Sequence, residues 1–241
     1  SDRFLYPIEL NLAGCDVLVV GGGPVAARKV AGLTGTGAKI RVVSPNLVPE
    51  LQHADGIERH EQAYAPELIG SARLVFACTD DRELNARIAA DARKAGCLCS
   101  VADDAEASDF AVPAVLRRGQ FTIAVGTGGA APHLAASVRD RLESQFGDDF
   151  GILVAELQRA RGIVRREIAD PQVRRRLMAT LCEEDSVERL KRDGPAAWRQ
   201  WLASTLEQTK ASADRTSLPK GYRLGTRIAD SGEPVHGGLM A

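Results

Sequence analysis

The chain has 241 residues, of which 31 are Lys or Arg and 32 are Asp or Glu, so its formal net charge is −1. Hydrophobic residues make up 44% and charged residues 26%, which is typical of a globular protein with one or two domains. The balanced charge argues against a nucleic-acid partner bound by bulk electrostatics. No apolar run approaches the ~20 residues that cross a bilayer, and no signal segment opens the sequence, so we expect no membrane partner.

The five cysteines are an odd number, which favours a reducing, cytoplasmic setting over a disulfide-stabilised fold. Cys97 and Cys99 are two positions apart with no histidine nearby, which is a poor zinc pattern. We interpret them as small buried residues beside a strand, and we predict no metal site.

Short apolar runs in the first 110 residues predict four strands, at residues 16–20, 38–43, 73–77 and 97–101. Helical stretches at residues 25–33 and 82–95 alternate with them. Uninterrupted apolar strands that alternate with helices are typical of a parallel sheet covered on both faces. The predicted fold class is therefore α/β, with a Rossmann-type sheet at the amino-terminal end.

The pattern changes after Phe110. A further strand is predicted at residues 120–125 and a helix at 132–146, in which Leu134, Val138, Leu142 and Phe146 form one apolar stripe. Residues 149–209 have helical periodicity, with breaks near residues 170–171 and 193–195 where Pro or Gly interrupts it. The last thirty or so residues are polar and aperiodic, and we expect them to be flexible.

A glycine-rich loop joins the first strand to the first helix. Gly21, Gly23 and Ala26 match the pattern G-x-G-x-x-A of dinucleotide-binding loops. Gly21 would permit the tight turn, Gly23 would let the backbone approach a pyrophosphate, and the helix N-terminus would favour its charge. The strand-turn-helix context favours dinucleotide binding over the alternative, a glycine turn that only packs.

The segment after the second strand indicates which dinucleotide is bound. It has no acidic residue in the usual position for a ribose contact and no arginine cluster for a 2′-phosphate. We therefore predict NAD rather than NADP, with Pro45 and Asn46 on the adenosine side.

Two polar segments follow later strands and should share their carboxyl edge, where open α/β sheets bind ligands. Thr79 could bond to the ribose or nicotinamide, or it could cap the next helix in competition with Asp80. Asp103 and Asp104 follow the next strand, and a carboxylate there could accept a proton beside the nicotinamide. The alternative is a solvated surface pair.

Several motifs occur in one order along the chain: Val19 to Lys29, Ala77 to Asp81 with Asn85, Ser100 to Asp103, Phe110 to Ala114, Arg117 to Gly119, and Ile123 to Gly129 with Pro132. Over roughly residues 4–205 this series resembles the siroheme synthase amino-terminal module, the precorrin-2 dehydrogenase and sirohydrochlorin ferrochelatase family.

The resemblance implies a homodimer whose chain has three parts, a Rossmann domain, a dimerisation segment and a small all-helical domain, which we place at residues 1–112, 113–148 and 149–209. The polar composition of the remaining residues 210–241 predicts a flexible tail. Fused members also have a methyltransferase, and too few residues follow 205 for one. We therefore expect the stand-alone form.

The resemblance also implies an activity, NAD-dependent oxidation of precorrin-2 to sirohydrochlorin, in many members followed by Fe²⁺ insertion to give siroheme. The family's catalytic aspartate aligns with Asp103, while Asp104 has no such role. Its cofactor contacts align with Pro24, Val25, Pro45 and Asn46. Thr127 replaces a serine that some members phosphorylate.

A tetrapyrrole with many carboxylates calls for cations and a broad site. Arg117, Thr127, Gly128 and His133 lie on or beside the loop nearest the Rossmann edge, and we take them as substrate-binding candidates. His133 could relay a proton or hold the metal; alternatively it only begins a helix.

Two alternatives remain. The protein could be a dehydrogenase without chelatase activity, which the sequence does not distinguish. It could also be a dinucleotide-sensing regulatory module, which explains the glycine loop but not the segment around Asp103.

Overall fold

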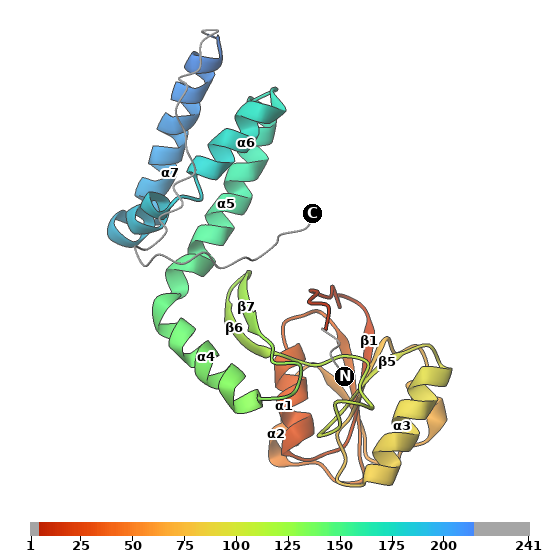
Figure 1. Cartoon of the computed structure of the whole chain (residues 1–241). Coiled ribbons are helices and arrows are strands. Elements are labelled where there is room, and N and C mark those ends of the chain that lie inside the picture. The colour runs from red at the N-terminus through yellow and green to blue at the C-terminus, as the bar shows by residue number, and fades with distance from the viewer. Residues whose placement is uncertain (1–4, 215–241) are drawn as a thin grey trace. The chain divides into compact units, whose positions relative to one another are not determined.

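The computed structural model describes residues 5–214, which form two compact units that divide between Gly147 and Asp148 (Figure 1). The first unit contains these elements in order: β1 (Asp16–Val20), α1 (Pro24–Leu33), β2 (Lys39–Val43), α2 (Pro49–Gln52), β3 (Ile57–His60), η1 (Pro66–Ile69), β4 (Leu74–Ala77), α3 (Arg82–Lys94), β5 (Leu98–Val101), β6 (Ala114–Arg118), β7 (Phe121–Val125) and α4 (Pro132–Gln145). The second unit contains α5 (Asp148–Glu167), α6 (Pro171–Thr180) and α7 (Glu184–Asp214).

Five parallel strands form the main sheet in the order β3-β2-β1-β4-β5. This order matches strands 3-2-1-4-5 of the dinucleotide-binding fold. In such sheets β1 lies in the middle, and the ligand crevice is at the carboxyl edge. The predicted α/β fold class is confirmed. The sequence patterns missed β3, which lies at the edge of the sheet and is only partly buried.

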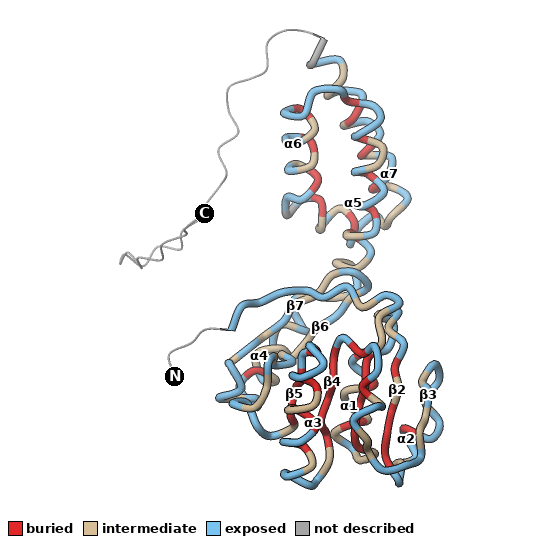
Figure 2. Tube along the Cα trace, turned by 90° about the vertical axis from the view of Figure 1, so that its right-hand side faces the viewer, coloured by how far each residue is buried: buried red, intermediate tan, exposed pale blue. Residues whose placement is uncertain are grey.

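Alternate residues of the central strands supply two hydrophobic cores, one on each face of the sheet. Val17 and Val19 pack in one core with Ala26 and Val30 of α1. Leu18 and Val20 pack in the other with Ile88 of α3. Buried residues are accordingly concentrated along the central strands (Figure 2). Burial on both faces explains why these strands have continuous apolar sequences.

After β5 the chain forms an antiparallel hairpin of β6 and β7, on which α4 packs. The helix α4 is less buried than its apolar stripe suggested. Leu134 of that stripe is 55% exposed, and the buried residue of this helix is Ala135. Clustering of contacts groups this segment with the sheet unit. Its separate role as a dimerisation segment stays a prediction.

The second unit is helical and has its own core around the fully buried Trp198, whose indole N–H donates to the buried Ser186 hydroxyl at 2.8 Å. Both predicted breaks occur. Asp170 caps α6, and α7 bends at Gly194, where φ is +79°. The predicted tail begins too early, because residues 210–214 continue α7, and residues 215–241 lie outside the described part of the chain. No helix within residues 5–214 is both long and apolar enough to span a membrane.

Candidate functional site

The glycine loop is pressed between two neighbouring loops. Gly21 has φ of +126°, and a Cβ there would lie 2.4 Å from the Cys78 carbonyl oxygen. A Cβ on Gly22 would lie 1.7 Å from the Asn46 carbonyl oxygen. The sequence pattern assigned Gly21 correctly as the tight turn but missed Gly22, which falls on a variable position of the motif. The loop therefore contacts the segments that follow β2 and β4.

Gly23 differs from its neighbours, since no atom of a described residue beyond its chain neighbours lies within 4 Å of a Cβ built there. It is the N-cap of α1, Pro24 and Val25 begin the helix, and neither a capping side chain nor an acidic residue serves the first turn. Among the described residues, no side chain therefore caps the free N–H groups of this first turn. Such an end attracts anions, so the loop fits the pyrophosphate of a dinucleotide.

The segment after β2, the strand that flanks β1 opposite β4, is hydrogen-bonded to the glycine loop. The Val48 N–H donates to the Gly22 carbonyl at 2.9 Å, and the Ser44 hydroxyl donates to the Asn46 carbonyl at 2.8 Å. Pro45 and Asn46 are exposed there. These two residues thus lie beside the glycine loop, as the assignment to the adenosine side requires.

The segment after β4 is organised by Asn85, which is only 4% exposed. Its side chain accepts from the Thr79 N–H at 3.1 Å and from the Thr79 hydroxyl at 2.7 Å, and it donates to the Thr79 carbonyl at 2.9 Å. The predicted capping competition between Thr79 and Asp80 was wrong. Asp81 is the N-cap of α3, because its carboxylate accepts from the Glu83 and Leu84 N–H groups.

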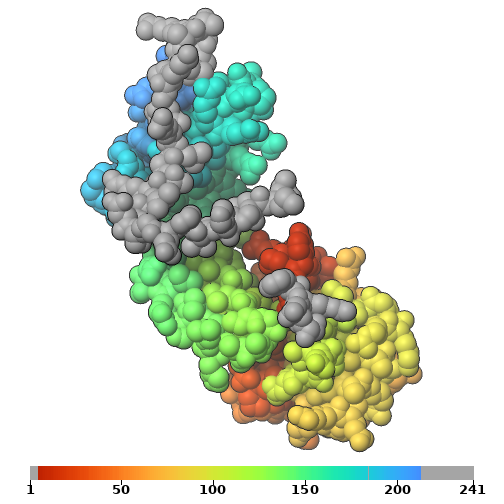
Figure 3. Space-filling view, in the orientation of Figure 1, coloured from red at the N-terminus to blue at the C-terminus, as the bar shows by residue number. Residues whose placement is uncertain are grey.

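Asp103 follows β5 at the same edge. The Ala102 N–H donates to the Ala77 carbonyl at 2.8 Å, so the pairing of β4 and β5 continues up to the residue before Asp103. Asp103 is exposed and has φ of +60°. Residues 103–106 are exposed, and the segment after β5 lies at the surface of the sheet unit (Figure 3).

The electrostatics of Cys78 connect these loops. Burial raises the pKa of the Cys78 thiol to about 11, while Lys29 and Arg28 of α1 lower it and the Asp103 carboxylate raises it. The Asp103 carboxylate therefore acts electrostatically on Cys78, and the backbone of Cys78 packs against Gly21. The glycine loop, Thr79 and Asp103 share one edge of the sheet.

The loop after β7 approaches the segment of Asp103. Gly129 has φ of +85°, and a Cβ there would lie 3.3 Å from the Ala105 Cβ. The Thr127 hydroxyl accepts from the Ala131 N–H at 3.2 Å, which orders the start of α4. Gly128, with φ of +61°, lies between Thr127 and Gly129 in this loop.

The remaining two substrate candidates are exposed. His133 is the second residue of α4, and Arg117 is on β6, where it pairs with Thr122. The structure gives neither of them a contact with Asp103. Within residues 5–214, no three or more His, Cys, Asp or Glu side chains gather as a set that could hold a metal ion.

Comparison with protein families matches residues 8–114 to a family described as "Putative NAD(P)-binding". The chain is 41% identical over 199 residues to a siroheme synthase from Chromobacterium violaceum, covering 80% of this chain and 42% of the relative. It is 32% identical over 229 residues to a siroheme synthase from Nitrosomonas eutropha, covering 93% and 48%. The chain thus spans just under half the length of these curated relatives.

Among solved structures, SirC, a precorrin-2 dehydrogenase, superposes with a TM-score of 0.69 at 22% sequence identity. The match covers 86% of this chain and the whole of that one. At this level of identity the comparison shows a shared fold.

Proposed function

The chain belongs to the siroheme synthase amino-terminal module family, and on that premise we propose that it oxidises precorrin-2 to sirohydrochlorin with NAD⁺. One observation supports this proposal most strongly. A glycine loop suited to a pyrophosphate and the exposed carboxylate of Asp103 share the carboxyl edge of one parallel sheet.

In this proposal the cofactor lies across that edge. Its pyrophosphate faces the uncapped first turn of α1, and its adenosine side lies by the segment after β2. The residues proposed to hold it are Gly21, Gly23, Pro24, Val25, Pro45, Asn46 and Thr79. Asn85 fixes Thr79 through three hydrogen bonds, which would keep its backbone in place beside the ribose.

The preference for NAD over NADP is supported by the contacts of the arginines on β2 and β3. Arg41 of β2 donates to the Leu68 and Ile69 carbonyls, both at 3.1 Å. Arg59 of β3 donates to the Leu51 carbonyl at 2.8 Å. Both guanidinium groups are thus engaged by the backbone rather than directed to a 2′-phosphate.

The proposed chemistry needs one acceptor for a hydride and one for a proton. When bound, the nicotinamide supplies the hydride acceptor. Asp103 accepts the proton that leaves the macrocycle, so one precorrin-2 and one NAD⁺ give one sirohydrochlorin, one NADH and one proton. Exposure of Asp103 allows it to reach a bulky substrate and to pass the proton on to water.

The substrate would rest beside Asp103 and the loop after β7. The close approach of Gly129 to Ala105 supports the inclusion of Thr127 and Gly128 in this surface. Arg117 is proposed to bind a substrate carboxylate, and His133 to contact the macrocycle, because both are exposed in the same unit.

Two further parts of the proposal concern metal and assembly. The relatives are named siroheme synthase, and a siroheme product requires iron, so we propose Fe²⁺ as a second substrate, with Asp103 removing pyrrole protons during insertion. We also propose a cytoplasmic homodimer. The apolar stripe of α4 supports a second copy there, because Leu134 is 55% exposed and Val138 and Leu142 are only partly buried.

Incubation with precorrin-2, NAD⁺ and Fe²⁺, followed by absorption spectroscopy, tests these possibilities. We expect NADH and siroheme together. NADH with sirohydrochlorin that stays metal-free would identify a dehydrogenase without chelatase activity. Binding of NAD⁺ without turnover would contradict the proposal and favour a dinucleotide-sensing module.

A further inference from the structure

Asp103 has an unusual backbone conformation. Of the residues that the structure describes, it is the one non-glycine residue with positive φ, at +60°. Aspartate tolerates the left-handed region better than most residues, but the conformation is still disfavoured. Such a residue persists where its surroundings fix it, and strained residues of this kind gather at functional sites. The contacts on either side of Asp103 are therefore informative.

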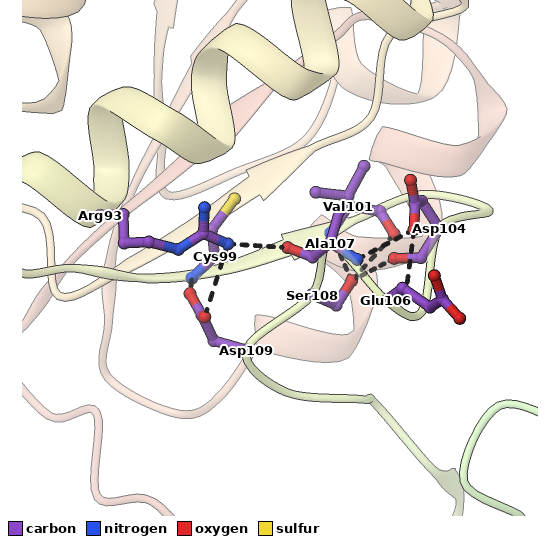
Figure 4. A network of polar contacts seen from close by, with 8 residues as sticks. All are labelled: Arg93, Cys99, Val101, Asp104, Glu106, Ala107, Ser108 and Asp109. Atoms are coloured by element: carbon purple, nitrogen blue, oxygen red, sulfur yellow. Dashed lines mark hydrogen bonds and ion pairs between the residues drawn. The ribbon is translucent and has the colours of Figure 1, made fainter. Parts of the chain in front are cut away.

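Asp104 fixes the chain directly after Asp103. One oxygen of its carboxylate, Oδ1, accepts from the Glu106 N–H at 3.1 Å and from the Ala107 N–H at 2.9 Å (Figure 4). This arrangement turns the chain back towards β5. The side chain acts here as a hydrogen-bond acceptor, and its negative charge is not required for that role.

Ser108 joins the residues on both sides of Asp103. Its hydroxyl oxygen accepts from the Val101 N–H at 2.9 Å, and its hydroxyl donates to the Asp104 carbonyl at 2.7 Å (Figure 4). Val101 is the last residue of β5, and Asp104 immediately follows Asp103. The Asp104 N–H also donates to the Val101 carbonyl, at a longer 3.4 Å, so the Ser108 hydroxyl reinforces a backbone contact that closes the turn presenting Asp103.

Asp109 anchors the far end of the segment to the sheet. Its carboxylate accepts from the Cys99 N–H at 2.9 Å, and its own N–H donates to the Cys99 carbonyl at 2.8 Å. The turn at Asp103 is therefore closed on a buried strand rather than free at the surface.

We propose that Asp104 and Ser108 are positioning residues, which hold Asp103 in its left-handed conformation so that its carboxylate faces the cofactor edge. This inference rests on the proposed dehydrogenase function. It assigns different chemistry to two adjacent aspartates: Asp103 must be a carboxylate, whereas Asp104 needs only an acceptor oxygen.

Paired substitutions at these positions test the inference in the full chain. Asp104→Asn keeps an acceptor oxygen, so kcat for precorrin-2 oxidation should stay within about twofold of wild type. Asp104→Ala and Ser108→Ala should lower kcat about tenfold or more, with the Kd for NAD⁺ unchanged, because a displaced base slows the chemical step. Ser108→Thr retains the hydroxyl and should restore most of the rate. Asp103→Asn should lower kcat for precorrin-2 oxidation about a hundredfold or more.

Asp170→Ala is the matched control. Asp170 also accepts from two backbone N–H groups, those of Gln172 and Val173, but it does so at the start of α6 in the helical unit. Its removal deletes the same kind of contact and should leave kcat at the wild-type value. A wild-type kcat in Asp104→Ala and Ser108→Ala, or equal losses in Asp104→Asn and Asp104→Ala, would overturn the inference.

Crystal structures of the Asp104 variants separate this inference from the proposed function. We expect positive φ at Asp103 in Asp104→Asn and its loss in Asp104→Ala. If wild type does not oxidise precorrin-2, the proposed function fails whatever these structures show. If the φ of Asp103 stays positive in Asp104→Ala, the positioning role fails even when wild type is active.

Discussion

Gly22 and Gly23 are neighbours, yet their surroundings predict different effects of the same substitution. A Cβ on Gly22 would overlap the Asn46 carbonyl oxygen, which belongs to the backbone and cannot rotate away. A Cβ on Gly23 would meet no non-adjacent atom within 4 Å in residues 5–214. Glycine is thus needed at position 22 for the fold and at position 23 for whatever approaches the loop.

We expect Gly22→Ala to lower the free energy of unfolding by about 2 kcal/mol or more, because the loop after β2 must move. Gly23→Ala should fold with nearly wild-type stability and bind NAD⁺ more weakly. Urea denaturation and calorimetry measure the two effects. Equal stability losses in both variants, or unchanged NAD⁺ affinity in Gly23→Ala, would contradict this account of the loop.

The buried thiol of Cys78 predicts a pH dependence of stability. Its pKa is raised by burial to about 11 from a usual value of 9.0. Between these pH values the unfolded chain loses the proton while the folded chain keeps it, so stability falls as pH rises. At pH 10 the loss from this thiol is about 1 kcal/mol.

Chemical denaturation without cofactor at pH 8 and pH 10 measures this effect. Cys78→Ala should show a smaller loss of stability over this interval than wild type. A residual slope is expected, because burial also raises the pKa of Cys99 to about 11. The same slope in variant and wild type would show that the Cys78 thiolate forms freely in the folded protein.

At the scale of elements, the turn from β4 to α3 depends on one amide side chain. Asn85 makes three hydrogen bonds to Thr79 and is buried where it does so. Asn85→Ala should cost about 1–3 kcal/mol of stability, because it leaves the Thr79 backbone groups unpaired. It should also weaken NAD⁺ binding. Asp81→Ala, which removes the cap of α3, is the comparison.

Asp81→Ala should cost about 1 kcal/mol and leave NAD⁺ affinity nearly unchanged, since it alters the helix start but keeps the Asn85 contacts. Thermal melts and NAD⁺ titrations distinguish the two variants. If Asn85→Ala affects only stability, Thr79 is not a cofactor contact.

The sequence patterns predicted the elements whose signals are local. The strands β1 and β4 are apolar over most or all of their length, β2 and β5 are mostly apolar, and the glycine loop follows the first of them. The edge strand β3 lacks such a run, because an exposed Glu and half-buried Arg and His side chains follow its first residue. The patterns also missed β6, although the two residues between it and β7, Gly119 and Gln120, are a hairpin signal.

The candidate site was predicted in the same uneven way. Gly21 and the position of Asp103 followed from motif spacing and resemblance. The crowding at Gly22, the three bonds of Asn85 and the network of Asp104 and Ser108 depend on contacts between segments far apart in the chain or on loop geometry. Local periodicity contains no information on such contacts.

For the whole molecule, the absence of a shared core between the sheet unit and the helical unit, within the described residues, predicts two unfolding events. Both tryptophans of the chain, Trp198 and Trp201, are in the helical unit. Tryptophan fluorescence therefore reports on that unit alone. The proposed cofactor site lies in the other unit, around Gly21 and Asp103.

We expect saturating NAD⁺ to raise the unfolding midpoint of the sheet unit, because a ligand stabilises the unit that binds it. Hydrogen exchange at the β1 and β4 amides monitors the unfolding of this unit. The midpoint followed by tryptophan fluorescence should shift little. An equal shift by both probes would mean that the two units unfold together. A shift by fluorescence alone would place the cofactor in the helical unit.

The central claim is that a nicotinamide and the Asp103 carboxylate act together on precorrin-2 at the edge of the sheet. The most direct test is the rate of NADH formation when the NAD⁺-saturated protein is mixed with precorrin-2, in wild type and in Asp103→Asn. Asparagine tolerates the same left-handed backbone, so the loop should be preserved. The account predicts equimolar NADH from wild type and a rate about a hundredfold or more lower in the variant, with equal NAD⁺ affinity. NADH formation at the wild-type rate in Asp103→Asn would contradict it.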